Sequence, residues 1–216
     1  MKPISRMEIA VLALLLTGSV GASLLLQQTG AVGQDVGDLQ TAQAVRQDRT
    51  SPASENRMAD VTLVVFSDYQ CPACLLAYPD MKRAVAKDGK VRVVFKDWPI
   101  FGERSKLTAE VALASRYQNI YVQVHDLLMS GKRLDGQTLK SAVEQSGGSW
   151  AQLQTDLGQH RRAIEEQLAR NAQQAFSLGL GGTPAYLIGP ILIRGRVTEA
   201  DFSRVIAQVR AKDQRL

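Results

Sequence analysis

Residues 61–95 read VTLVVFSDYQCPACLLAYPDMKRAVAKDGKVRVVF and contain two strand patterns around one helix pattern. The continuous β-branched run 61–66 is typical of a strand that is buried on both faces of a sheet. Apolar residues recur at helical spacing over 75–87, and after the Asp88-Gly89 turn residues 91–95 repeat the strand pattern. The segment therefore predicts a β-α-β unit, with Cys71 and Cys74 where the first strand passes into the helix.

The two cysteines of the chain share one window, Cys71-Pro72-Ala73-Cys74, so they cannot form a framework of structural disulfides in 216 residues. At a helix N-terminus, unpaired backbone N–H groups and the helix dipole stabilise a thiolate on Cys71 and lower its pKa. The two intervening residues place Cys74 one turn later, within bonding reach. Pro72 suits the first turn of a helix, and Ala73 adds no polar contact. The window predicts a pair that cycles between dithiol and disulfide.

Three other interpretations of the pair are weaker. A structural zinc site needs two more ligands, and the two histidines, His125 and His160, lie in separate predicted helices. A cysteine–histidine hydrolase would leave Cys74 without a role, and an inert pair has no reason to flank a helix start. We therefore expect redox chemistry with no metal and no cofactor, and we expect both histidines on the surface or between packed helices.

The charge balance says little about partners. The chain carries 26 Lys and Arg against 21 Asp and Glu, which gives a net charge of +5. The basic residues are scattered and do not alternate with aromatic residues, which argues against nucleic acid as a partner. A mildly basic, solvated surface accounts for this balance.

Residues 1–28 have the pattern of an export signal or a single membrane anchor. Lys2 and Arg6 precede a stretch without charge, residues 9–26, which is at the short end of what spans a bilayer. Val20-Gly21-Ala22 offers a cleavage site, yet the apolar run continues beyond it, so the cleaved and uncleaved forms stay equally open. Either form would place the rest of the chain outside the cytoplasm.

Residues 29–58 are rich in Gln, Gly, Asp, Ser and Thr and contain no aromatic residue. This composition predicts a flexible polar spacer. Apolar residues nevertheless recur at helical spacing, at positions 32, 36, 39, 42 and 45, so a short amphipathic helix that pairs with a second copy is the alternative. The chain could then form a homo-oligomer through this segment.

The remaining patterns complete the fold. Residues 105–178 show only helical periodicity, interrupted by glycines, and predict an all-helical insert. Strand patterns follow at 183–188 and 191–194, and an amphipathic helix pattern closes the chain over 198–212. We expect an α/β fold in which 59–104 and 179–216 form one mixed sheet with its helices, and 105–178 is inserted between them.

Three motifs stand out together: FSDYQCPAC at 66–74, FKDWPIFG at 95–102 and GTPAY at 182–186. In combination they resemble the DsbA-type thiol–disulfide oxidoreductases of the bacterial cell envelope, over roughly residues 60–212. The resemblance implies a thioredoxin-like fold with a helical domain inserted between the two β motifs, in agreement with the order of patterns above.

The resemblance also implies roles for single residues. Cys71 matches the nucleophile and Cys74 the resolving cysteine. Pro184 matches the proline of the family whose preceding peptide bond is cis, an uncommon isomer, and which faces the disulfide. Such a bond would expose the backbone of Thr183 for strand-like pairing with an extended substrate. We expect the substrate to contact Thr183 together with the two residues between the cysteines, Pro72 and Ala73.

The chain departs from the wider thioredoxin pattern near the cysteines. Many members carry a buried carboxylate six residues before the first cysteine, and here that position is Val65. Asp68 is nearer but follows the strand, so the group that relays the proton of Cys74 stays open. Lys96 is a candidate charge near the site, although a solvated lysine is the simpler expectation. Ala73 replaces the histidine of strongly oxidising members, which predicts a less oxidising couple.

These observations favour an enzyme that introduces disulfides into exported proteins. Its partners would be unfolded or partly folded proteins with cysteines and a membrane redox partner that reoxidises it. It would work in the periplasm or on the outer face of the inner membrane, where residues 9–26 would tether it if they are not cleaved. The alternatives are a disulfide isomerase or reductase that is kept reduced, and a tethered chaperone-like assembly factor whose cysteines are vestigial.

Overall fold

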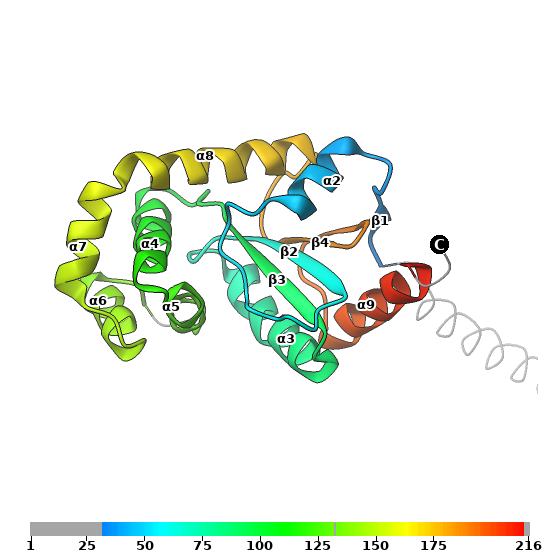
Figure 1. Cartoon of the computed structure of the whole chain (residues 1–216), viewed down its shortest axis with the longest axis horizontal. Helices are drawn as coiled ribbons and strands as arrows, with labels where there is room; N and C mark the ends of the chain where they lie inside the picture. Colours follow the sequence, from blue (N-terminus) through cyan, green and yellow to red (C-terminus); the bar gives the residue numbers. More distant parts are fainter. Residues whose placement is uncertain (1–31, 132, 214–216) are drawn as a thin grey trace, which may run out of the picture. The chain divides into compact units, whose positions relative to one another are not determined.

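The structure is a computed structural model that describes residues 32–131 and 133–213. Within them five strands form one mixed sheet (Figure 1). The strands are β1 (Gln34–Asp35), β2 (Val61–Ser67), β3 (Val91–Asp97), β4 (Ala185–Ile188) and β5 (Ile191–Arg194), in the order β1-β5-β4-β2-β3. Strands β2 and β3 are parallel, and the other neighbours pair antiparallel. Because β2 and β3 are parallel, their carboxyl ends lie at the same edge of the sheet.

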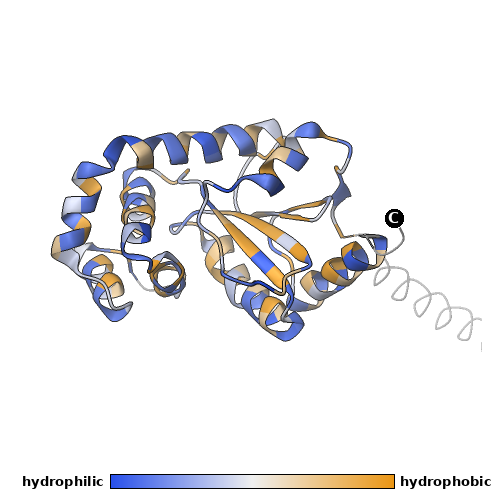
Figure 2. Cartoon of the chain, in the orientation of Figure 1, coloured by the Kyte–Doolittle hydropathy of each residue, from blue (hydrophilic) through white to orange (hydrophobic). Residues whose placement is uncertain are grey.

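Helices cover both faces of the sheet. They are α2 (Gln40–Gln47), α3 (Pro72–Asp88), α4 (Glu103–Ala114), the 3₁₀ turn η1 (Ser115–Gln118), α5 (Tyr121–Leu128), α6 (Gly136–Gln145), α7 (Trp150–Gln159), α8 (Arg161–Ser177) and α9 (Glu199–Asp213). Helices α2 and α8 lie over one face, α3 and α9 over the other, and α4 to α7 gather beside the sheet (Figure 1). Figure 2 shows the reason for this layering. Strands β2 and β3 are largely hydrophobic, whereas α8 is mostly hydrophilic on its exterior.

The predicted β-α-β unit is confirmed, and its boundaries follow from local chemistry. Six of the seven residues of β2 are buried, as expected for a central strand. Cys71 is the N-cap of α3 and Pro72 occupies its first turn, where a missing N–H costs nothing. Gly89 ends the helix with a φ of 75°, a conformation that glycine adopts without strain.

The segment that was expected to be a flexible spacer differs most from the prediction. From Gly33 on, it belongs to the same compact unit as the rest of the described chain. Helix α2 forms, and Val36, Ala42 and Val45 are buried in a cluster that includes Phe66 of β2. The physical reason is the amphipathic spacing, because these apolar side chains find a hydrophobic sheet face within their own chain. Three of the apolar side chains are therefore used within the chain, whereas Leu39 is 48% exposed.

The predicted N-terminal hydrophobic helix lies outside the described residues. Among the residues that the structure does describe, none of the helices is long and apolar enough to cross a membrane.

Candidate active site

The two cysteines lie at the start of α3 as free thiols, and each is 2% exposed. The backbone N–H of Cys74 donates to Cys71 Sγ over 3.3 Å, because the N-cap position aims the side chain back at the first turn. The thiol of Cys71 also lies 3.4 Å from the carbonyl oxygen of Thr183. Both contacts hold the first sulfur at the positive end of the helix.

The two sulfurs have opposite electrostatics. A hydrogen bond from the Cys74 thiol and the backbone N–H groups of Cys74 and Ala73 lower the pKa of Cys71 to about 6, against the opposing effect of burial. The same thiol–thiol hydrogen bond raises the pKa of Cys74, and burial raises it further. Cys71 is therefore the thiolate near neutral pH, and Cys74 keeps its proton.

Thr183 and Pro184 come from the other end of the chain. The Thr183–Pro184 peptide bond is cis, which is the isomer that the resemblance implied. It directly precedes β4, which pairs antiparallel with β2 and so reaches the edge of the sheet from which Cys71 follows. The structure thus brings together the residues of both distant motifs, with Pro72 and Ala73 in the first turn of α3 beside them.

Asp68 anchors the loop between β2 and Cys71. It is 2% exposed and accepts four hydrogen bonds on its carboxylate. The donors are Gln70 N at 2.7 Å, Ser105 Oγ at 2.7 Å, Ile100 N at 2.6 Å and Phe101 N at 3.1 Å. With its acceptor positions filled, this side chain fixes two loops against each other and is poorly suited to relay the proton of Cys74.

A second buried carboxylate, Asp97, lies at the end of β3, in register with Ser67. The hydroxyl of Tyr69 donates to it over 2.9 Å, and the hydroxyl of Tyr121 reaches both of its oxygens, at 3.0 and 2.9 Å. Nδ1 of His125 lies 2.7 Å from the Tyr69 hydroxyl. Burial raises the pKa of Asp97 to about 7 and lowers that of His125 to about 3.

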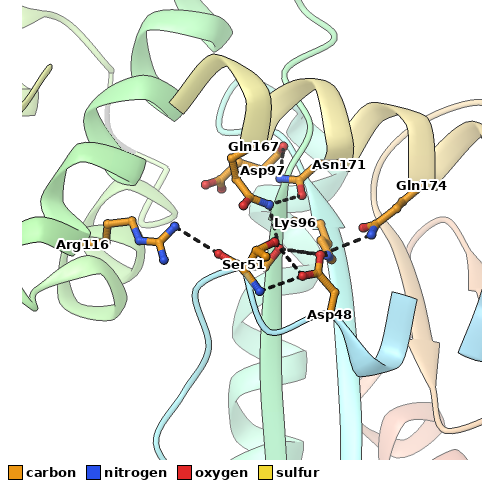
Figure 3. Close-up of polar contacts among 9 residues, drawn as sticks. Asp48, Ser51, Lys96, Asp97, Arg116, Gln167, Asn171 and Gln174 are labelled. Atoms are coloured by element: carbon orange, nitrogen blue, oxygen red, sulfur yellow. Dashed lines mark hydrogen bonds and ion pairs between the residues drawn. The ribbon is translucent and has the colours of Figure 1, made fainter. Parts of the chain in front are cut away.

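Lys96 corrects the expectation of a solvated lysine near the site. Its side chain is fully buried and forms an ion pair with Asp48 on the far side of the sheet from Asp97. Its ammonium also donates to Ser51 Oγ over 2.8 Å, and Gln174 of α8 donates to Asp48 over 3.2 Å (Figure 3). A buried lysine needs such a partner, and the segment after α2 supplies it.

The sequence analysis did not single out Asp97, Tyr69 or Tyr121, and it expected His125 on the surface or between packed helices. His125 is indeed buried between aromatic rings, with its centroid 4.5 Å from that of Phe95. A usable signal existed in the parallel strand patterns, because their carboxyl ends meet at one edge of a sheet. That rule places the last residue of β3 beside the residues that precede Cys71.

Comparison with known proteins agrees with this geometry. The sequence profile of the family described as Thioredoxin matches residues 48–208. A thioredoxin-like oxidoreductase from Silicibacter pomeroyi is 30% identical, with a TM-score of 0.72 over 80% of this chain and 98% of that one. A periplasmic thioredoxin-like protein from Salmonella enterica serovar Typhimurium is 29% identical, with a TM-score of 0.70 over 80% of this chain and 98% of that one.

Curated relatives are more distant in sequence. A probable disulfide bond formation protein D from Bacillus cereus is 25% identical over 67% of this chain and 70% of its own length. The Na(+)/H(+) antiporter NhaA 3 of Salinispora tropica is 26% identical over 61% of this chain. The match spans only 20% of that antiporter's length.

Proposed function

Since the chain belongs to the thioredoxin family and is a DsbA-like thiol–disulfide oxidoreductase, we propose that it introduces disulfides into exported proteins. A substrate thiolate attacks Cys71 of the oxidised Cys71–Cys74 pair, and the enzyme S–S bond breaks. The electron pair goes to Cys74, which takes up a proton. A second substrate thiolate then attacks the mixed disulfide at the substrate sulfur. The products are an oxidised substrate and a reduced enzyme with Cys71 as the thiolate.

The observation that carries this direction is the stabilised anion on Cys71. The Cys74 thiol and two backbone N–H groups lower the pKa of Cys71 to about 6, although Ala73 offers no side-chain donor. Stabilising the thiolate stabilises the reduced form, and that makes the disulfide form a better oxidant. A stabilised Cys71 thiolate therefore favours transfer of the disulfide to substrates.

The surface beside the cysteines supports unfolded proteins as substrates. Ile100 and Phe101 are 41% and 52% exposed, and Asp68 holds their backbone next to the loop that leads to Cys71. Adjacent exposed apolar side chains beside a reactive group offer a contact surface for apolar segments of another chain. We infer further that a membrane redox partner reoxidises the pair, and that the protein works in the periplasm or on the outer face of the inner membrane, as the periplasmic Salmonella relative suggests.

The test is the redox equilibrium of the Cys71–Cys74 pair with glutathione at pH 7. An oxidase should have a potential of about −200 mV or higher, more oxidising than thioredoxin at about −270 mV. The oxidised protein should also form disulfides in a reduced, unfolded substrate, and Cys71→Ser should abolish this activity. A potential near that of thioredoxin would contradict the proposal that the protein oxidises its substrates.

A disulfide isomerase or reductase is the second candidate. Cys71 is the thiolate of the reduced pair near neutral pH because its pKa is lowered, and a resident thiolate can attack wrong disulfides. The state of the pair in cells separates the two roles. A mostly oxidised pair supports the oxidase, and a mostly reduced pair together with activity on a scrambled substrate supports the isomerase.

A further inference from the structure

Asp97 is a buried carboxylate that the exchange of thiols and disulfides does not use. It is 1% exposed, and within the described residues its carboxylate forms no ion pair. Its hydrogen bonds come from Tyr69 of the loop before Cys71 and from Tyr121 of α5. Burying a carboxylate without a cation costs stability, so the cluster requires an explanation other than stabilising the fold.

Counting protons identifies the state in which this cluster is best satisfied. The single hydroxyl proton of Tyr69 can go either to Asp97 or to Nδ1 of His125. If Asp97 is ionised, Tyr69 donates to it and accepts from Nδ1–H of a neutral His125. Nε2 of His125, which has no hydrogen-bond partner among the described residues, then carries a lone pair and no buried donor is left unpaired. Below about pH 7, where Asp97 takes up a proton, Oδ1 can still accept from Tyr69, so this hydrogen bond orients the Tyr69 hydroxyl in both forms of the carboxyl group.

The charged groups around the cluster come from several elements. Asp68 raises the pKa of Asp97 by its negative charge, though less than burial does. Asn171 of α8 donates to the backbone oxygen of Asp97 over 2.9 Å. On the side of His125, Asp126 of α5 accepts from Tyr78 of α3 and pairs with Lys82. None of these groups connects the loop 68–70 to β3 through another buried side chain.

That loop sets the position of the nucleophile. Cys71 N donates to Asp68 O over 3.1 Å, and Asp68 ties the loop to residues 100–105. Tyr69 is the one side chain of the loop that reaches Asp97. A small shift of the loop would change the 3.3 Å contact from Cys74 N to Cys71 Sγ, which helps to stabilise the thiolate.

We propose that Asp97 is a positioning residue for thiol–disulfide exchange, which acts through the Tyr69 hydroxyl to fix the loop that carries Cys71. The helical insert contributes Tyr121 and His125 to the cluster, but the link from Asp97 to the loop runs through Tyr69. The inference rests on exchange at Cys71 and is independent of its direction.

The test measures the pKa of Cys71 from the pH dependence of its alkylation in the reduced, full-length protein. Asp97→Asn removes an acceptor, and Tyr69→Phe removes the link to the loop. Each should raise the pKa of Cys71 by about half a unit or more, which slows alkylation at pH 5 about threefold. Tyr121→Phe is the matched control, since it removes an equally buried hydroxyl from the same carboxylate but leaves the loop attached, and it should leave the pKa unchanged.

The outcomes separate this inference from the proposed function. An unchanged pKa of Cys71 in Tyr69→Phe, or an equal shift in Tyr121→Phe, would show that the cluster only stabilises the fold. Tyr69→Phe keeps this test available if Asp97→Asn does not fold. If Cys71 of the unmodified protein reacts with oxidised glutathione no faster than a free thiol, exchange itself fails and the inference with it.

Discussion

At the scale of single residues, the reactivity of the site depends on one sulfur acting on the other. Cys74 contributes both its thiol proton and its backbone N–H to Cys71. The thiol–thiol hydrogen bond is the largest cause of the lowered pKa of Cys71. The resolving cysteine is thus also the main activator of the nucleophile in the reduced state.

Replacing Cys74 should therefore change Cys71. We expect Cys74→Ala to raise the pKa of Cys71 from about 6 by about one unit, because the thiol donor is lost and the backbone donors remain. Cys74→Ser keeps an O–H donor at the same place and should raise the pKa less. Thiolate absorbance followed against pH measures both variants. Equal pKa values in Cys74→Ala and the unmodified reduced protein would contradict this assignment.

The buried histidine makes stability depend on pH with a definite sign. The folded protein lowers the pKa of His125 to about 3, whereas the unfolded chain has the ordinary value of about 6.5. Below pH 6.5 His125 binds a proton in the unfolded state but stays neutral in the folded state. This contribution to the free energy of unfolding is therefore fully present above pH 6.5 and is lost as the pH falls toward 3.

His125→Phe should remove that dependence. The ring fits among Phe95, Tyr78 and Tyr121, so the variant should fold, with a cost of about 1 kcal/mol at pH 7 for the lost hydrogen bond. As the pH falls from 6.5 to 4.5, the stability of the unmodified protein relative to the variant should decrease by about 1.4 kcal/mol per pH unit. Urea unfolding at several pH values measures this difference. A difference that does not vary with pH would mean that His125 can be protonated in the folded state.

At the scale of elements, one ion pair attaches the segment around α2 to the sheet and to α8. Lys96 and Asp48 are 0% and 6% exposed, and Ser51 accepts from both Lys96 and Gln167 of α8 (Figure 3). Asp48 keeps further donors from Thr50 and Gln174, whereas among the residues that the structure describes Lys96 has only Ser51 besides Asp48. Removing Asp48 and removing Lys96 should therefore destabilise the protein to different extents.

We expect Asp48→Ala to destabilise the protein by about 3–5 kcal/mol, because a buried ammonium loses its counter-charge. Lys96→Met should cost less, about 1–3 kcal/mol, because Asp48 remains hydrogen-bonded. The double variant should cost clearly less than the sum of the two single variants. Urea unfolding of the four proteins forms a double-mutant cycle. Additive costs would show that the pair is not coupled in solution.

The elements also show what the sequence could and could not predict. The strands and helices of 61–97 and 183–213 follow from local periodicity, the turn residues and the caps, all within a few residues. The attachment of 33–58 depends on partners far along the chain, such as Phe66 for the apolar face of α2 and Lys96 for Asp48. The composition of this segment is polar, but whether it packs on the sheet depends on the three or four of its residues that are buried.

At the scale of the whole molecule, the catalytic sheet and the helical insert share their interior. The buried Trp98 ring, directly after β3, packs edge-on against the largely exposed ring of Phe176 of α8, with centroids 5.5 Å apart. Asn171 of α8 and Tyr121 of α5 both hydrogen-bond to Asp97. The division of the chain into 59–104 with 179–216 and an insert of 105–178 remains a prediction. These contacts argue that the two parts stabilise each other.

The two tryptophans allow this coupling to be measured. Trp98 lies at the junction of sheet and insert, and Trp150 begins α7 within the insert. In Trp150→Phe the fluorescence follows Trp98, and in Trp98→Phe it follows Trp150, while far-ultraviolet circular dichroism of the same sample follows the whole chain. We expect the fluorescence and dichroism transitions in urea to coincide within each variant, because one buried network spans both parts. Comparing probes within one variant cancels the stability cost of each substitution. A Trp150 transition at clearly lower urea would show that the insert unfolds alone, and Asp97 would then lose its Tyr121 contact before the sheet opens.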